Sequence, residues 1–326
     1  MLKRLFAGLT LAALVAAPAA MAQERPKELN FGIISTESTQ NLRQDWAVLL
    51  EDMQKRLGMK VNAFFAPDYA GIIEGMRFNK VQVAWFGNKS GMEAVDRASG
   101  EVIAQQISEE GHPGYWSLLI VHKDSPLNSL EDVKRNAKSL ALGFGDPNST
   151  SGFLVPSYYV MALNNLDPKS SFKVMRQANH ETNLVAVVNR QVDVATNNTE
   201  TFEKFTRRNP EEAKKVRVIW KSPLIPNDPM VVRKDLDPGL KAEIREFFVS
   251  YGKDEREKQA LHKIHIGGFQ ASDNNQLLPI RQLELFKTKI AVEKDERMAA
   301  AEKQAKLADI ERQLASLNQQ MAALKK

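Results

Sequence analysis

Short hydrophobic runs alternate with amphipathic stretches along most of the chain. The runs have the length and the β-branched or aromatic content of strands. Several of them are apolar throughout, as strands covered on both faces are. The pattern predicts strands at Leu29–Ile34, Val61–Ala66, Val81–Phe86, Trp116–Val121, Leu140–Gly143, Val192–Thr196 and Val216–Trp220.

The stretches between these runs follow the helical period. From Trp46 to Leu57 apolar residues recur every three or four positions, and Gly58 is suited to end the helix. Alternating strands and helices predict an α/β architecture with parallel sheets. In such sheets, ligands bind beyond the carboxyl ends of the strands, on loops and helix N-termini. Further helical patterns cover 70–78, 151–164, 181–189, 238–251 and 254–263.

From about Gln282 onward the chain contains no Pro or Gly and is rich in Ala, Glu, Lys, Gln and Leu. Two structures fit this tail: a helix folded back onto the body, or an arm that pairs with a second chain. We expect the second, a homodimer through the tail, because the apolar residues alternate at spacings of three and four, as in a coiled coil. These residues are Leu307, Ile310, Leu314, Leu317, Met321 and Leu324.

The N-terminus has the pattern of an export signal. Lys3 and Arg4 precede an apolar run from Leu5 to Ala17, and Ala20-Met21-Ala22 is a small-x-small cleavage site. The run is too short for a permanent membrane helix, although an uncleaved anchor is the alternative. We expect a signal peptide over residues 1–22, cleavage after Ala22 and a periplasmic mature chain.

Composition excludes several kinds of chemistry. The chain has no Cys, which rules out disulfides, cysteine nucleophiles and thiolate metal sites. The net charge of +5 falls further when Lys3 and Arg4 are removed, and no block of Lys or Arg indicates nucleic-acid binding. His262 and His265 are three residues apart without an acidic or third His partner in the motif, so we expect a surface pair and no metal site.

The segment Gly145–Gly152, GDPNSTSG, follows a predicted strand and opens a helical pattern. Its three consecutive hydroxyls, Ser149, Thr150 and Ser151, would stand at a helix N-terminus, where free N–H groups favour an anion. No Lys or Arg lies in the segment, and the spacing is not that of a P-loop. The alternative is a simple N-cap. Pro156 predicts a kink or a later start of this helix.

This segment and several others resemble the periplasmic phosphonate-binding proteins of ABC importers. The resemblance runs from about Leu29 to Phe286, and long motifs such as APDYAGII and GDPNSTSGFLVP make it specific. Further matching stretches are Leu29–Ser38 (LNFGIISTES), Asn62–Gly71 (NAFFAPDYAG), Gly75–Lys80 (GMRFNK), Asn197–Glu200 (NNTE) and Lys221–Pro226 (KSPLIP).

The resemblance implies the type II periplasmic-binding fold, in which two α/β lobes close on a ligand about a two-crossing hinge. We expect one lobe at 23–120 with 225–285, the other at 121–224, and a C-terminal helical arm at 286–326. The crossings are expected near 118–124 and 220–226.

The resemblance also implies the ligand contacts and no cofactor. Ser149, Thr150, Ser151, His180 and Tyr69 would hold the phosphonate group. Tyr115, Glu200 and Asp228 would face the amino group of 2-aminoethylphosphonate, because a buried ammonium needs a carboxylate to offset its desolvation. Trp85, Phe86 and Trp116 are apolar enough to be core.

The function that this resemblance implies is capture of organophosphonates, with 2-aminoethylphosphonate first, and their delivery to a membrane permease. Within the same fold, the alternative ligands are phosphite, phosphate or an alkylphosphonate. An alternative from another class is a periplasmic phosphonate or phosphate hydrolase, which would need metal ligands or an activated nucleophile. A scaffold protein built around the tail is a third possibility.

Overall fold

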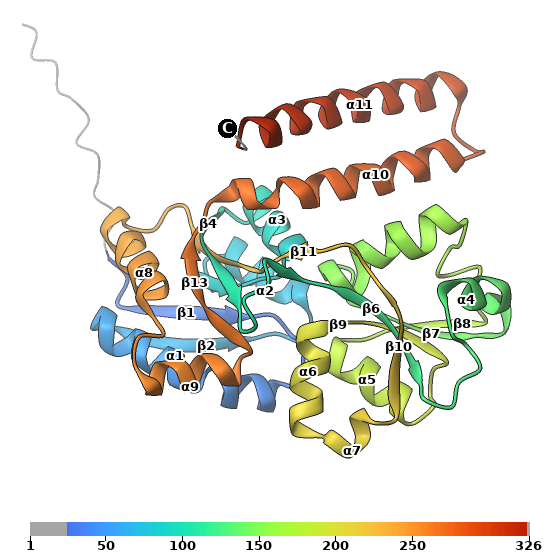
Figure 1. Cartoon of the computed structure of the whole chain (residues 1–326). Coiled ribbons are helices and arrows are strands. Elements are labelled where there is room, and N and C mark those ends of the chain that lie inside the picture. The colour runs from blue at the N-terminus through green and yellow to red at the C-terminus, as the bar shows by residue number, and fades with distance from the viewer. Residues whose placement is uncertain (1–24, 325–326) are drawn as a thin grey trace, which may run out of the picture.

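The computed structural model describes residues 25–324, so the predicted signal peptide lies outside the described residues. Two sheets define two lobes (Figure 1). One contains β1 (Glu28–Ile33), β2 (Lys60–Phe65), β3 (Val83–Trp85), β4 (Gly100–Ser108), β12 (Pro229–Arg233) and β13 (Ile266–Ala271). The other contains β6 (Ser117–His122), β7 (Ala141–Phe144), β8 (Val174–Gln177), β9 (Val194–Asn198) and β10 (Val216–Lys221).

Helices cover both sheets and bury their apolar faces against them. The first lobe carries α1 (Thr39–Leu57), α2 (Tyr69–Arg77), α3 (Asn88–Arg97), α8 (Pro238–Ser250) and α9 (Glu255–Lys263). The second carries α4 (Leu130–Asn136), α5 (His180–Val188), α6 (Thr199–Arg208), α7 (Pro210–Ala213) and a helical segment over 150–164. Two more helices, α10 (Leu278–Lys294) and α11 (Ala300–Ala323), end the chain.

The α/β prediction is confirmed, and every strand predicted from the sequence is present, with ends shifted by a residue or two. The expectation of purely parallel sheets is wrong. The orders are β13-β4-β12-β3-β1-β2 and β10-β6-β9-β7-β8, and β12 and β6 pair antiparallel with their neighbours. Both strands follow a passage between the lobes, so the chain enters each sheet from the hinge side.

The two passages between the lobes lie side by side. β5 (Gly114–Tyr115) and β11 (Ile225–Pro226) pair antiparallel in a small ladder of their own. The first passage therefore comes a few residues before the predicted 118–124, because Ser117–His122 already belongs to the second sheet. The second passage agrees with 220–226. The lobe limits proposed from the sequence stay a prediction.

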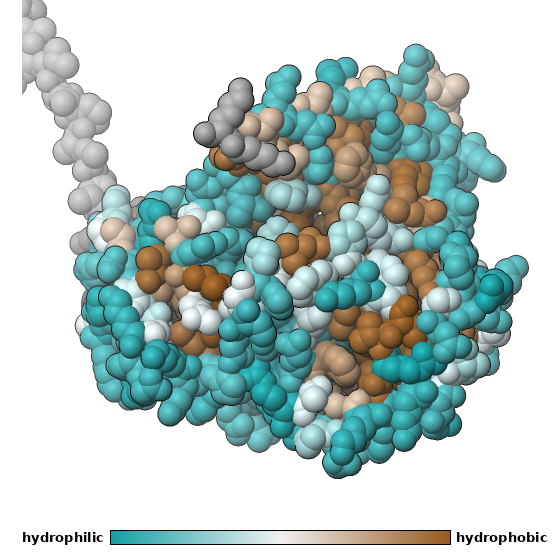
Figure 2. Space-filling view, viewed as in Figure 1, coloured by the Kyte–Doolittle hydropathy of each residue, from teal (hydrophilic) through white to brown (hydrophobic). Residues whose placement is uncertain are grey.

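The C-terminal helices form a hairpin that spans both lobes (Figure 1). On the first lobe, Arg281 of α10 pairs with Asp96 of α3 at 2.5 Å. On the second, Phe286 stacks on Tyr158, with ring centroids 6.0 Å apart. Figure 2 shows several apolar patches on this face, near these helices and on each lobe, among largely hydrophilic residues.

The heptad residues of α11 pack within the chain. Ile310 and Leu314 form a small core with Val292 of α10, and Leu317 is buried as well. The sequence analysis favoured pairing of these heptad residues with a second chain. The structure instead has the helix folded back, because the exposed apolar face of α10 offers these residues a partner in the same chain. Homodimerisation is a separate question, which we take up below.

We expect Leu314→Asp to detach α11 from α10, since a charge cannot be buried in this small apolar core without a partner. Limited proteolysis should then cleave the segment after Asp295 at least several times faster than in the unchanged protein. Ala315→Asp adds the same charge at the next, exposed position and is the control. Equal cleavage rates for both variants would contradict the packing described here.

Candidate functional site

A small cavity lies between the lobes, and all eight residues predicted to bind ligand line it. The cavity is small and is lined by residues of both lobes, so it suits a compact solute. The eight residues are Tyr69, Tyr115, Ser149, Thr150, Ser151, His180, Glu200 and Asp228.

The hydroxyl segment has the conformation of a capped helix start. Ser149 Oγ accepts a hydrogen bond from Gly152 N at 3.0 Å, and the turn that follows is wide, with Leu154 N donating to Ser149 O at 3.1 Å. Gly145 is needed because a Cβ there would lie 2.5 Å from the Gly152 backbone. The three hydroxyl residues are buried at the cavity wall.

Pro156 explains how this turn is fixed to the sheet. Proline has no N–H, so the carbonyls of Ser151 and Gly152 lose the donor that position 156 would supply to them in a π- or α-helix. Both carbonyls accept other hydrogen bonds: Ser117 Oγ donates to Ser151 O at 2.6 Å and Thr196 Oγ1 donates to Gly152 O at 2.7 Å. The predicted helix over 151–164 is present, and it winds as a π-helix before and after Pro156.

The other lobe meets the hydroxyl segment directly. Lys89 N, in the first turn of α3, donates to Thr150 Oγ1 at 2.8 Å. Tyr69 N, at the start of α2, donates to Asp146 Oδ2 at 3.2 Å. The N-termini of helices on both lobes therefore meet at the hydroxyl segment. An anion held there would be bound by dipoles and hydroxyls of both lobes at once.

His180 caps the cavity at the first position of α5. Its Nε2 lies 3.3 Å from Ser149 Oγ and 3.3 Å from Asn198 Nδ2, while its Nδ1 is buried without a partner among the described residues. Burial, together with the charge of Lys204, lowers the pKa of His180 to about 4. The ring is neutral at pH 7 and can donate one hydrogen bond.

Two carboxylates, Glu200 and Asp228, also line the cavity. Asp228 Oδ1 accepts from Tyr115 Oη at 3.1 Å and from Asn88 Nδ2 at 3.2 Å. Glu200, on the first turn of α6, has no side-chain hydrogen bond among the described residues. Burial raises the pKa of both carboxyl groups, and the charge of Asp228 raises that of Glu200 further. In the absence of a cation, at least one proton is therefore held between them.

Several lining residues escaped the sequence analysis. Lys204 lies one turn after Glu200 and pairs with Glu37 of the other lobe. Asn198 caps α6 and donates to Ser151 Oγ at 3.1 Å. The amphipathic pattern of α6 could have been found from the sequence, whereas the Glu37 partner could not. Trp85, expected to be core, stacks on Trp46 and also lines the cavity.

The expectation for the histidine pair is wrong in part. His262 is exposed, but His265 is only 4% exposed and lies against Glu109 and Glu203. Its carboxylate partners are distant in the sequence, so the local motif gave no sign of them.

No helix in the described range 25–324 is long and apolar enough to cross a membrane. Two hinged α/β lobes around a solvent-excluded polar cavity define a solute-binding protein of the type II periplasmic class. The family model of the phosphonate periplasmic substrate-binding proteins of ABC transporters matches residues 31–277. The chain belongs to this family, which consists of transport proteins and not of enzymes.

Curated relatives agree with this assignment. The phosphonates-binding periplasmic protein of Escherichia coli K12 is 56% identical over 305 residues, which cover 94% of this chain and 90% of the relative. A probable phosphite-binding ABC transporter protein of Prochlorococcus marinus is 25% identical over 79% of this chain and 89% of its own length.

A solved structure supports the fold throughout. A binding-protein component of a phosphonate ABC transporter from Pseudomonas aeruginosa superposes with a TM-score of 0.90 at 54% identity, covering 93% of this chain and all of that one. The predictions of family and fold are therefore confirmed, and the chain is a phosphonate-binding component of a periplasmic ABC transport system.

We expect Thr150→Ala and Ser149→Ala to weaken every phosphonate alike, by about 1.5–3 kcal/mol for each lost charge-assisted hydrogen bond. Calorimetry with a series of phosphonates that differ only in the tail measures this. Ser157→Ala, two turns further on, is the control. Unchanged affinity in both variants would place the anion elsewhere.

Proposed function

We propose that the protein captures 2-aminoethylphosphonate and delivers it to a membrane permease. The observation that carries the proposal is that groups suited to an anion and groups suited to a cation line the same small cavity. Ser149, Thr150 and two helix starts suit an oxyanion, while Glu200 and Asp228 in the same cavity suit a cation. A zwitterion with phosphonate and ammonium groups satisfies both ends.

Charge distinguishes this ligand from the alternatives in the same fold. Phosphite, phosphate or a simple alkylphosphonate would leave Glu200 and Asp228 buried without a cation, and one charged carboxylate would repel the anion. The relative from Prochlorococcus marinus is named as a probable phosphite-binding protein, so phosphite is the alternative ligand that the wider family suggests. Burial raises the pKa of both carboxyl groups, and a bound ammonium would stabilise their charged forms. This supports a ligand that carries an ammonium group.

A hydrolase is less well supported. Ser149 Oγ and His180 Nε2 stand 3.3 Å apart, close to the geometry of a nucleophile and its base. However, His180 Nδ1 has no orienting carboxylate among the described residues, and a pKa of about 4 makes the ring a poor base at neutral pH. Incubation with 2-aminoethylphosphonate should release no phosphate.

The remaining proposals concern location and partners. We place the mature chain in the periplasm after cleavage at Ala22, with a permease as its membrane partner and no nucleic acid. We also propose a homodimer in which α11 contacts the same helix of a second chain. Light scattering on the full mature protein, and on one ended after Asp295, tests that prediction.

The sharpest test of ligand identity uses charge without changing shape. Glu200→Gln and Asp228→Asn should each weaken 2-aminoethylphosphonate by about 2–4 kcal/mol, because an ammonium would lose one side of a buried pair. Ethylphosphonate should bind these variants as well as before, or better. Calorimetry at fixed pH and salt measures both ligands.

Glu211→Gln, on the exposed surface of α7, is the matched control and should change neither affinity. If both ligands lose affinity equally in the Glu200 and Asp228 variants, the carboxylates are structural and the aminophosphonate assignment fails.

A further inference from the structure

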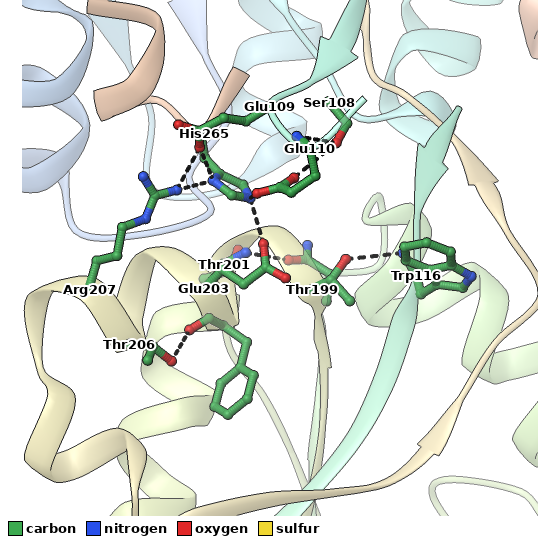
Figure 3. A network of polar contacts seen from close by, with 12 residues as sticks. Ser108, Glu109, Glu110, Trp116, Thr199, Thr201, Glu203, Thr206, Arg207 and His265 are labelled. Atoms are coloured by element: carbon green, nitrogen blue, oxygen red, sulfur yellow. Dashed lines mark hydrogen bonds and ion pairs between the residues drawn. The ribbon is translucent and has the colours of Figure 1, made fainter. Parts of the chain in front are cut away.

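A cluster of charged side chains outside the cavity connects the two lobes through His265 (Figure 3). Its Nδ1 lies 2.7 Å from Glu109 Oε2, and its Nε2 lies 2.7 Å from Glu203 Oε2 and 3.5 Å from Glu110 Oε1. Both ring nitrogens of a buried histidine therefore face carboxylates.

These carboxylates belong to different lobes. His265 lies between α9 and β13, and Glu109 and Glu110 directly follow β4, all in the first lobe. Glu203 is on α6 of the second lobe, so its contact with Nε2 crosses the opening between the lobes. In this arrangement of the lobes, the contact joins α6 of the second lobe to the first lobe.

The backbone at His265 is unusual. Its φ of 60° lies in the left-handed region, which glycine and asparagine adopt at least cost. Such a conformation costs about 1–2 kcal/mol for a residue with a side chain of this kind. The contacts of the His265 side chain with the three carboxylates can offset this strain.

An imidazolium ring is the form that can donate from both nitrogens at once. Burial alone lowers the pKa of His265, but the hydrogen bond to Glu203 and the charges of Glu110 and Glu200 outweigh it and raise the pKa. Two further groups face this ring: Arg207 of α6, which contacts Nδ1 and Glu109, and the exposed His262 of α9. The charge of Arg207 opposes protonation, and Glu109 offsets it.

The cluster is joined to the ligand cavity by short stretches of chain. Ile264 lines the cavity, and the next residue is His265. On α6, Glu200 faces the cavity and Glu203, one turn later, faces His265. Because both residues are on α6, a movement of this helix that shifts Glu200 in the cavity also shifts Glu203 relative to His265.

We propose that His265 is a positioning residue for ligand capture, which in its protonated form joins Glu203 to Glu109 and Glu110 and so stabilises the closed state. The inference rests on the proposed capture function. Because the pKa of His265 is raised in the closed form, the stabilisation is complete at low pH and is lost as pH rises through that pKa.

The test compares the affinity of the unchanged protein for 2-aminoethylphosphonate with that of His265→Asn, by calorimetry from about pH 5.5 to 8.5. The ratio of the two dissociation constants cancels the titration of the ligand itself. We expect the variant to bind about five- to tenfold more weakly at the low end, since the carboxylates are partly exposed, and equally at the high end.

Three further variants sharpen the result. His265→Gly removes the side chain together with the backbone strain and should show the same ratio as His265→Asn. Glu203→Gln should give the same loss, and combining it with His265→Asn should add nothing. His122→Asn, within the second lobe, is the control and should leave the ratio at one throughout.

A ratio that is constant with pH, or equal to one at low pH, would overturn the proposal. So would a chelator that reduces the affinity of the unchanged protein to that of the variant, since a metal ion would then join these donors. An unchanged protein that binds no 2-aminoethylphosphonate would instead refute the proposed function.

Discussion

Desolvation of charge is the constraint on which the rest of this structure depends. When the lobes close, the cavity that remains admits little more than a small solute, so every ionic group in its wall loses water. Ser149, Thr150 and Ser151 carry no charge and can bind an anion through dipoles and hydrogen bonds. Glu200 and Asp228 cannot do so, and they retain protons until a cation replaces them. A ligand with both charges removes the conflict.

Desolvation of charge also acts on the His265 cluster outside the cavity. The helix α6 connects this cluster to the cavity. This helix brings Glu200 and Lys204 to the cavity, Glu203 and Arg207 to His265, and Arg208 to Glu37 and Asp45 of the first lobe. Glu203, Lys204, Arg207 and Arg208 of this helix therefore all form ion pairs with residues of the first lobe. Binding and closure are coupled because one rigid helix holds the groups that serve both.

Local patterns predicted what depends on local sequence. The helix over 46–57, the strands and the capped turn at Ser149 all follow from periodicity and residue type, and Pro156 marked the unusual turn. The direction of β12, the packing of α11 and the partners of Lys204 and His265 did not follow. Each depends on residues that are distant in the sequence and are brought together only by the fold. The family resemblance supplied Glu200 and Asp228, which spacing alone could not bring to one cavity.

The measurement that tests the central claim most directly is the number of protons released when ligand binds. Calorimetry at pH 7 in buffers of different ionisation enthalpy gives that number for 2-aminoethylphosphonate and for ethylphosphonate. An ammonium held between Glu200 and Asp228 lowers their raised pKa values, so 2-aminoethylphosphonate should release more protons than ethylphosphonate. Equal proton release by the two ligands would contradict the account.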